Sequence, residues 1–194
     1  MDKNIPVKNE DLIFIEETLA GNRESFSCLV DKYKDRLFNL VYRFMGNKDD
    51  TMDVCQDAFL QAYTHLNTFK IDCNFSTWLF TIAVNISKNK LKRKKFLNFS
   101  IDRQVQTEDD EINNEPADKN SHSEETMLKQ ERAELLNEMI GSLSSDYKIP
   151  FLLKHQENRS LEEIARITNL SVGVVKIRIH RARNILYNSF KERL

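Results

Sequence analysis

Cationic side chains gather at two places in the chain, and both groups could bind the phosphates of a nucleic acid. Six of the eight residues from 88 to 95 are Lys or Arg, with no acidic residue among them. The second group is formed by Lys176, Arg178, His180, Arg181 and Arg183. Neutralising phosphates releases condensed counterions, which supplies most of the nonspecific affinity for nucleic acids. The formal net charge of the chain is only −1, so such affinity must come from local separation of charge.

The second cationic group lies on a predicted helix-turn-helix. Ser160 and Glu163 have the spacing of a capping box, in which each side chain caps a backbone N–H of the other residue. A short apolar period follows and ends at residues 168–170, where Asn169 tolerates a left-handed turn. Ser171 can cap a second helix. The apolar stripe of that helix is Val172, Val175, Ile179, Ala182 and Leu186. A short helix, a tight turn and a cationic second helix have the geometry that places a recognition helix in the major groove of DNA. The alternative is an ordinary helical hairpin whose cationic face is merely solvated.

The first cationic group continues a helix that is predicted to begin at residues 75–78. Three aromatic side chains, Phe75, Trp78 and Phe80, lie upstream of the cations. Aromatic rings beside a basic stripe suit unstacked bases, because every base offers a π-face. The alternative is that Phe75 and Trp78 are core residues.

Helices are also predicted upstream, over residues 11–20 and 25–45, and a third begins with acidic residues near 50. The buried side of this third helix is predicted to be Cys55, Ala58, Phe59, Ala62, Tyr63 and Leu66. Its other side forms an acidic ridge of Asp50, Asp53, Gln56, Asp57 and Gln61. Such a ridge would suit a basic partner surface.

The composition predicts an all-α fold of two small helical domains joined by a flexible acidic linker. Four glycines, three prolines and 30% charged residues are typical of a mostly helical protein. Residues 1–97 are expected to form the first domain. Residues 98–126 are expected to form the linker, because they are rich in Asp and Glu and poor in apolar residues. Residues 127–194 are expected to form the second domain, which contains the helix-turn-helix.

The pattern gives no support to metal, cofactor or catalytic chemistry. Cys28, Cys55 and Cys73 lie far apart without a C-x-x-C pair, so we expect reduced thiols, with a redox role for one of them left open. The histidines share no metal-ligand spacing with the cysteines, and no Ser/His/Asp arrangement suggests a triad. No apolar run approaches the roughly 18 residues of a membrane span. Residues 1–10 are polar. We therefore expect a soluble, cytoplasmic protein without a signal peptide.

The order of these features resembles a bacterial RNA polymerase sigma factor, and most closely the small extracytoplasmic-function group, which has only sigma regions two and four. The resemblance is carried by SFSCLVDKYKDRLFNLVYRF (25–44), DVCQDAFLQAY (53–63), FSTWLFTIAVNISKNKLKRKK (75–95) and LEEIARITNLSVGVVKIRIHRAR (161–183). It implies a non-enzymatic transcription factor that directs core RNA polymerase to promoters and helps to open the minus-ten element. It also implies a role in a stress response and regulation by an anti-sigma factor, through which any membrane association would come.

The resemblance implies three sets of site residues. Those that would dock on the clamp-helix coiled coil of core polymerase are Asp50, Asp53, Gln56, Asp57 and Phe59. Those that would bind the melted minus-ten element are Phe75, Ser76, Trp78, Asn85, Lys88, Lys92, Arg93 and Lys94. Those that would read the minus-thirty-five duplex are Ser171, Gly173, Val174, Lys176, Ile177, Arg178, Arg181 and Arg183. The amide of Asn85 could hydrogen-bond a flipped base.

The chain departs from the family pattern in the recognition helix. Val174 stands where many members have a hydroxyl residue, and Ile177 where many have serine. Two polar groups are thereby removed from the helix, and apolar contact with thymine methyl groups becomes possible. Asn169 stands where glycine is common, which the turn permits.

Two other functions would account for part of the pattern. A dimeric helix-turn-helix regulator would use residues 160–183 but leaves the acidic ridge and residues 88–95 without a role. A nucleic-acid-modifying enzyme would need a cluster of carboxylates, a metal set or an activated nucleophile, and none can be assembled from this sequence.

Overall fold

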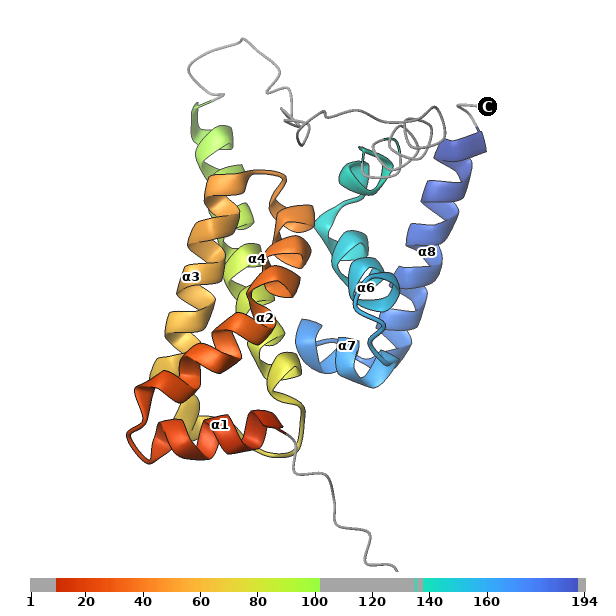
Figure 1. Ribbon diagram of the computed structural model, residues 1–194. Helices are drawn as coiled ribbons and strands as arrows, with labels where there is room; N and C mark the ends of the chain where they lie inside the picture. The colour runs from red at the N-terminus through yellow and green to blue at the C-terminus, as the bar shows by residue number, and fades with distance from the viewer. Residues whose placement is uncertain (1–9, 102–134, 136–137, 192–194) are drawn as a thin grey trace, which may run out of the picture.

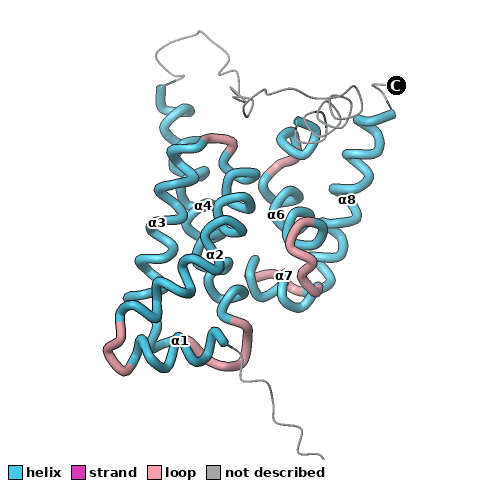
Figure 2. Tube along the Cα trace, viewed as in Figure 1, coloured by secondary structure: helices cyan, strands magenta, loops and turns pink. Residues whose placement is uncertain are grey.

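Helices and short loops make up the part of the chain that the structure describes, residues 10–101, 135 and 138–191 of a computed structural model, and no strand occurs among them (Figures 1 and 2). The N-terminal half consists of α1 (Glu10–Leu19), α2 (Arg23–Met45), α3 (Lys48–Thr64), the 3₁₀ helix η1 (Leu66–Thr68) and α4 (Phe75–Ile101). The C-terminal half contains α6 (Ser145–His155), α7 (Leu161–Thr168) and α8 (Val172–Lys191). The predicted all-α fold class is confirmed.

Side-chain and backbone caps set the sharp connection between α2 and α3. Gly46 ends α2 in the left-handed conformation (φ 68°), and its N–H donates to the carbonyl oxygen of Tyr42. The Asn47 side chain then accepts from the N–H of Asp50 at 3.0 Å and caps α3. Because only two residues separate the end of α2 from the start of α3, the two helices run antiparallel and pack along their length (Figure 1).

The buried face of α3 agrees with the predicted one in part: Ala58, Ala62 and the following Leu66 are buried as predicted. Thr51 and Val54 are also buried, and neither was predicted to be. Cys55 and Phe59 are only half-buried, and Tyr63 is 38% exposed. The prediction missed Thr51 because hydroxyl residues are usually placed outside a core. Here the Thr51 hydroxyl donates to the carbonyl oxygen of Asn47 at 2.6 Å, so its burial leaves no donor unsatisfied.

The predicted helix-turn-helix is present as α7, a tight turn and α8. Both hydrogen bonds of the capping box form: the Glu163 N–H donates to Ser160 Oγ, and the Ser160 N–H donates to Glu163 Oε2. Asn169 ends α7 with φ 56°, the left-handed conformation expected of it. The Ser171 hydroxyl oxygen accepts from the Val174 N–H at 3.3 Å and caps α8.

The apolar stripe of α8 is shorter than predicted. Val175, Ile179 and Ala182 are buried, whereas Leu186 is half-buried and Val172 is 40% exposed. Val172 is the first residue of α8, so it stands before the part of the helix that packs against α6 and α7. The open start of α8 is therefore free to meet a partner.

The two halves pack directly against each other. One hydrophobic cluster contains buried side chains from both halves, including Tyr33 and Phe75 from the first and Ile149 and Ile164 from the second. Helix α7 lies against α4, and α6 lies against α2 (Figure 1). The predicted domains therefore share an interface that the sequence pattern did not indicate.

The expected linker is described only at its start. Helix α4 continues to Ile101, past the expected boundary at residue 97. The rest of the expected linker, and residues 127–134 and 136–137 of the expected second domain, lie outside the described residues. None of the described helices is long and apolar enough to cross a membrane.

Candidate polymerase and nucleic-acid interfaces

The acidic ridge on α3 presents carboxylates and apolar side chains together. Asp53, Gln56 and Asp57 are exposed, as predicted for a surface that meets a basic partner. Met52 and Leu60 stand beside them at 54% and 62% exposure. Sequence reasoning missed these two because a ridge was defined by charge alone. Exposed carboxylates with adjacent apolar side chains suit a protein partner, since the apolar area can be buried on binding.

Asp50 differs from the other ridge residues because α4 holds it. Its carboxylate accepts from Lys90 Nζ at 2.9 Å and from Lys94 Nζ, and its side chain is only 14% exposed. Lys90 also reaches Asp53 at 2.9 Å. Partial burial acts to raise the pKa of Asp50, but the hydrogen bonds from Lys94 and Lys90 outweigh it and leave that pKa below its usual value. Asp50 thus joins α3 to α4 and is not an open docking side chain in this arrangement.

The predicted minus-ten residues of α4 fall into two groups. Trp78 is half-buried, whereas Asn85, Lys92 and Arg93 are exposed and accessible to a nucleic acid strand. Lys94 is also exposed, but its Nζ is paired with Asp50 and must leave that carboxylate before it can contact a phosphate. Phe75 and Ser76, by contrast, are 1% and 6% exposed.

Phe75 lies in an aromatic cluster, with its ring centroid 5.7 Å from that of Tyr33, 6.0 Å from Phe69 and 5.9 Å from Trp78. Phe75 is therefore a core residue, as the alternative interpretation held, and its ring is not open to an unstacked base.

Lys88 belongs to the cationic segment but faces the C-terminal half. Its Nζ donates to the carbonyl oxygen of Thr168 at 3.3 Å. Burial, and then the nearby Arg178 guanidinium, lower the pKa of Lys88. A phosphate could use Lys88 only after this hydrogen bond is broken.

The recognition helix presents the predicted residues on its open side. The exposed ones are Ser171, Gly173, Val174, Lys176, Ile177, Arg181 and Arg183. Val174 and Ile177 are 38% and 53% exposed, so their apolar side chains are available for contact with a partner. Arg178 is the exception, because its guanidinium donates to Asp146 of α6 at 3.0 Å and is 25% exposed. Arg178 must leave Asp146 before it can bridge a base.

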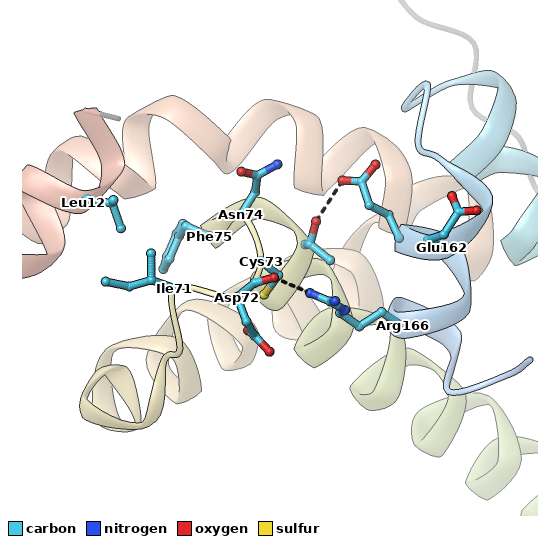
Figure 3. A pocket seen from close by; sticks show the side chains of 10 residues that line it. Leu12, Ile71, Asp72, Cys73, Asn74, Phe75, Glu162 and Arg166 are labelled. Atoms are coloured by element: carbon cyan, nitrogen blue, oxygen red, sulfur yellow. Dashed lines mark hydrogen bonds between the residues drawn. The ribbon is translucent and has the colours of Figure 1, made fainter. Parts of the chain in front are cut away.

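A cavity of about 390 Å³ lies where the two halves meet (Figure 3). Its wall includes Asp72 and Cys73 from the loop before α4, and Glu162 and Arg166 from α7. The Arg166 guanidinium spans it and donates to the Asp72 carbonyl oxygen at 2.7 Å. No group of three or more potential metal ligands occurs among the described residues. The cavity is part of the contact between the halves.

The cysteines differ in reactivity. Burial raises the pKa of Cys55 to about 12 and also raises the pKa of Cys73, for which burial is again the largest cause. Both therefore stay protonated near neutral pH, where the thiolate would be the reactive form. Cys28 is exposed on α2. A redox role is disfavoured for Cys55 and Cys73.

Comparison with known proteins matches both halves to the regions named by the resemblance. The family model for sigma-70 region 2 matches residues 29–96, and the model for sigma-70 region 4 matches residues 133–186. The chain is 32% identical over 179 residues to the ECF RNA polymerase sigma factor SigW of Bacillus subtilis, covering 92% of this chain and 95% of that protein. The chain belongs to the extracytoplasmic-function sigma factors. This sigma factor is also 33% identical over 178 residues to the sigma-E factor of Escherichia coli K12, covering 92% of this chain and 93% of that one.

Solved structures share the fold of this sigma factor. CnrH, in complex with the cytosolic domain of CnrY, superposes with a TM-score of 0.66 at 24% identity and covers 95% of this chain and 99% of its own. RpoE of Bartonella quintana, in complex with the anti-sigma factor NepR, gives a TM-score of 0.65 at 24% identity, covering 87% and 98%.

As a member of this family, the protein is a non-enzymatic initiation factor that directs RNA polymerase to promoters. The alternatives of a lone regulator and a modifying enzyme are therefore set aside.

Proposed function

We propose that this sigma factor uses three separate surfaces to bring core polymerase to a promoter. The acidic ridge on α3 docks on the clamp-helix coiled coil, the exposed face of α4 binds the melted minus-ten element, and α8 reads the minus-thirty-five duplex. The observation that carries this assignment is charge segregation within a chain of formal net charge −1. Helix α3, which carries exposed carboxylates, lies on the far side of the N-terminal half from α6–α8 (Figure 1). Exposed cations lie on α8 and on the end of α4, where Lys90 and Lys94 pair with Asp53 and Asp50 of α3.

On α4, recognition of a melted strand combines an aromatic platform with an amide and phosphate contacts. Trp78 offers part of its ring for stacking, and Asn85 presents a donor and an acceptor two turns further along the same helix. Lys92, Arg93 and Lys94 follow as phosphate contacts. The buried Phe75 ring contacts the Trp78 ring and so holds it in place for stacking.

On α8, sequence is read by apolar as well as polar groups. Val174 and Ile177 contact thymine methyl groups, since neither can hydrogen-bond a base edge. The duplex is held by its phosphates, which contact Lys176, Arg181 and Arg183. The exposed start of α8, at Ser171 and Gly173, approaches the sugar-phosphate backbone of the DNA. Arg178 reads guanine once it has left Asp146.

An anti-sigma factor is the proposed regulator, and the cytoplasm the proposed compartment. Support for this partner comes from RpoE, a protein of the same fold whose solved structure contains the anti-sigma factor NepR. The matches to region 2 and region 4 support the proposed division into two functional units joined by the acidic segment 98–126. Core polymerase and promoter DNA, the other partners, are cytoplasmic in bacteria.

The docking surface is tested by reversing two of its charges, Asp53→Lys and Asp57→Lys. We expect the double variant to lose co-purification with core polymerase, because the ridge would then repel a basic surface. Its helicity should be unchanged, since exposed charge changes shift stability by only about 0.5 kcal/mol. The matched control is Asp31→Lys with Asp35→Lys, an exposed pair with the same spacing on α2. Binding of core polymerase by the folded ridge variant, equal to that of the control, would remove the docking assignment.

A further inference from the structure

Arg183 of α8 is in contact with the last residue of α6. Its Nε and Nη2 atoms form hydrogen bonds with Nε2 of His155, at 3.4 and 3.3 Å. Helices α6 and α8 pack against each other along this boundary. Both residues are exposed, so the contact lies at the surface of the C-terminal half. It joins a proposed phosphate contact of α8 to a histidine that has no role in the three proposed surfaces.

The chemistry of the two groups decides the state of the imidazole. A guanidinium has only N–H donors and no acceptor, so Nε2 of His155 must present its lone pair to Arg183. The contact therefore exists only when the imidazole is neutral and carries its proton on Nδ1. A protonated imidazole would place two cationic groups at hydrogen-bonding distance, and the two side chains would separate.

The surroundings of His155 favour this neutral form. Partial burial is the largest cause that lowers the pKa of His155, followed by the charge of Arg183 and then that of Lys154. The Phe151 ring lies against the imidazole, with the two ring centroids 4.5 Å apart. Phe151 itself packs against the hydrophobic core cluster, so the imidazole is supported from its own helix.

The charges that act on His155 are both cationic. Arg183 faces it from α8, and Lys154 is its neighbour on α6. Helix α6 packs against α2 and α7 as well as α8. Other charged groups that join α6, or the turn after it, to these neighbours are paired with one another: Arg178 with Asp146, Arg36 with Glu157, and Arg159 with Glu163.

The contact with His155 leaves one edge of the Arg183 guanidinium for a ligand. Among the described residues, the hydrogen bonds of Arg183 use Nε and Nη2 and leave Nη1 unused. A guanidinium held in this way can offer Nη1 and the second N–H of Nη2 to two oxygens of one phosphate. The arginine is then ordered before DNA arrives, so the entropy cost of fixing a long side chain does not arise on binding.

We propose that His155 is a positioning residue for the minus-thirty-five contact of α8, because its neutral imidazole holds Arg183 in the orientation that binds a DNA phosphate. This inference rests on the proposed phosphate role of Arg183. DNA binding by α8 then depends on pH through a residue that does not itself touch DNA. The pKa of His155 is lowered in the folded protein, so the effect is complete above pH 6.5 and is lost as the pH falls through that lowered pKa.

Two substitutions separate the hydrogen bond of His155 from its packing. His155→Gln keeps an acceptor, the amide oxygen, but does not titrate. His155→Leu removes the acceptor and keeps an apolar side chain that can pack against Phe151. Arg183→Ala, alone and combined with each substitution, completes a double-mutant cycle. The matched control is His65→Leu, which removes an exposed histidine from the N-terminal half.

The contact itself is measured by nitrogen NMR of the full-length, isotopically labelled protein. At pH 7 we expect His155 to carry its proton on Nδ1, and its pKa to lie below 6.5. The preference for Nδ1 should be lost in Arg183→Ala. An imidazole that carries its proton on Nε2 at pH 7 in the unmodified protein would overturn the inference, whatever the protein does with DNA.

The effect on DNA is measured with holoenzyme, formed from core polymerase and each variant, on a promoter fragment that the unmodified protein selects in purified transcription. At pH 7, His155→Leu should weaken binding by about three- to tenfold, the effect of leaving one long side chain unordered. His155→Gln and His65→Leu should bind about as tightly as the unmodified protein. Lowering the pH to about 5.5 should weaken the unmodified holoenzyme relative to His155→Gln, toward the affinity of His155→Leu. In the Arg183→Ala background, neither substitution of His155 should matter.

Two results with DNA would overturn the inference. Equal affinities of His155→Leu and the unmodified protein at pH 7 would mean that His155 does not position Arg183 for DNA. An unmodified holoenzyme that binds more tightly than His155→Gln as the pH falls would mean that His155 binds a phosphate itself. The proposed function is judged separately, because unmodified holoenzyme that binds no better than core polymerase alone would remove it, and this inference with it, even where NMR shows the contact.

Discussion

Residues of one type, a turn apart on α3, have different roles because their surroundings differ. Asp53 is 68% exposed at its side chain, whereas Asp50 is 14% exposed and accepts from two lysines of α4. The first can meet a partner at little cost to the free protein. The second holds the end of α4 beside α3 and so orients the cations that are proposed to contact DNA.

The change Asp50→Asn tests this structural role. The hydrogen bonds from Lys94 and Lys90 lower the folded-state pKa of Asp50 despite the opposing effect of burial, so its charge stabilises the fold above the unfolded pKa of 3.8. This contribution is lost as the pH falls through the folded-state pKa. We expect the variant to be less stable by about 1 kcal/mol at pH 7. The difference from the unmodified protein should shrink as the pH falls below 3.8 and disappear once Asp50 is protonated in the folded state.

Urea unfolding at pH 7 and at a series of lower pH values, followed by circular dichroism, measures the difference in stability and its loss. Asp53→Asn is the control and should change the stability at pH 7 by less, because Asp53 shares only Lys90 and is mostly solvated. Equal losses of stability in the two variants would show that Asp50 is merely another surface carboxylate.

Helix α4 packs against the C-terminal half at its start and is proposed to bind DNA along its exposed remainder. Its start is buried against α7, its middle carries the exposed Asn85, and its end carries Lys92, Arg93 and Lys94. Replacing these three cations with alanine should weaken the holoenzyme on all promoters alike. It should also reduce the slope of log affinity against log salt by about one unit for each phosphate that is no longer neutralised.

The salt slope is obtained from filter binding of the holoenzyme at several salt concentrations. The control replaces Arg23, Lys34 and Arg43, three exposed cations of α2, with alanine. A slope that changes equally in both triple variants would reflect net charge alone and would contradict a phosphate-binding role for the end of α4.

Local features of the elements could be predicted from the sequence, whereas contacts between distant elements could not. The capping box of Ser160 and Glu163 and the left-handed Asn169 depend on neighbours within a few positions, so their residue types sufficed. Thr51 was missed because its burial depends on a hydrogen bond that only the folded helix makes.

The contact of Arg159 with Ser76 joins residues 83 positions apart, and neither residue type signals it. From the sequence alone, Arg159 is one of many cations near a helix start, and Ser76 is a polar residue at the start of a helix. For the same reason the sequence pattern indicated two domains joined by a linker, without the interface between them.

At the scale of the whole molecule, the two halves share one hydrophobic cluster, and the start of α4 is covered by the C-terminal half. The α3 ridge, the proposed docking surface for core polymerase, is exposed in this arrangement, so the proposed docking needs no separation of the halves.

Transcription in a purified system tests the central claim most directly. Core RNA polymerase is supplied with a pool of genomic fragments, with this protein, without it, or with the Asp53→Lys, Asp57→Lys variant, and the 5′ ends of the transcripts are mapped. We expect a discrete set of start sites that depends on the unmodified protein and is lost with the variant, and shared sequence at minus ten and minus thirty-five upstream of those starts. Start sites that are identical with and without the protein, or tight binding of promoter duplex by the protein in the absence of polymerase, would contradict the account.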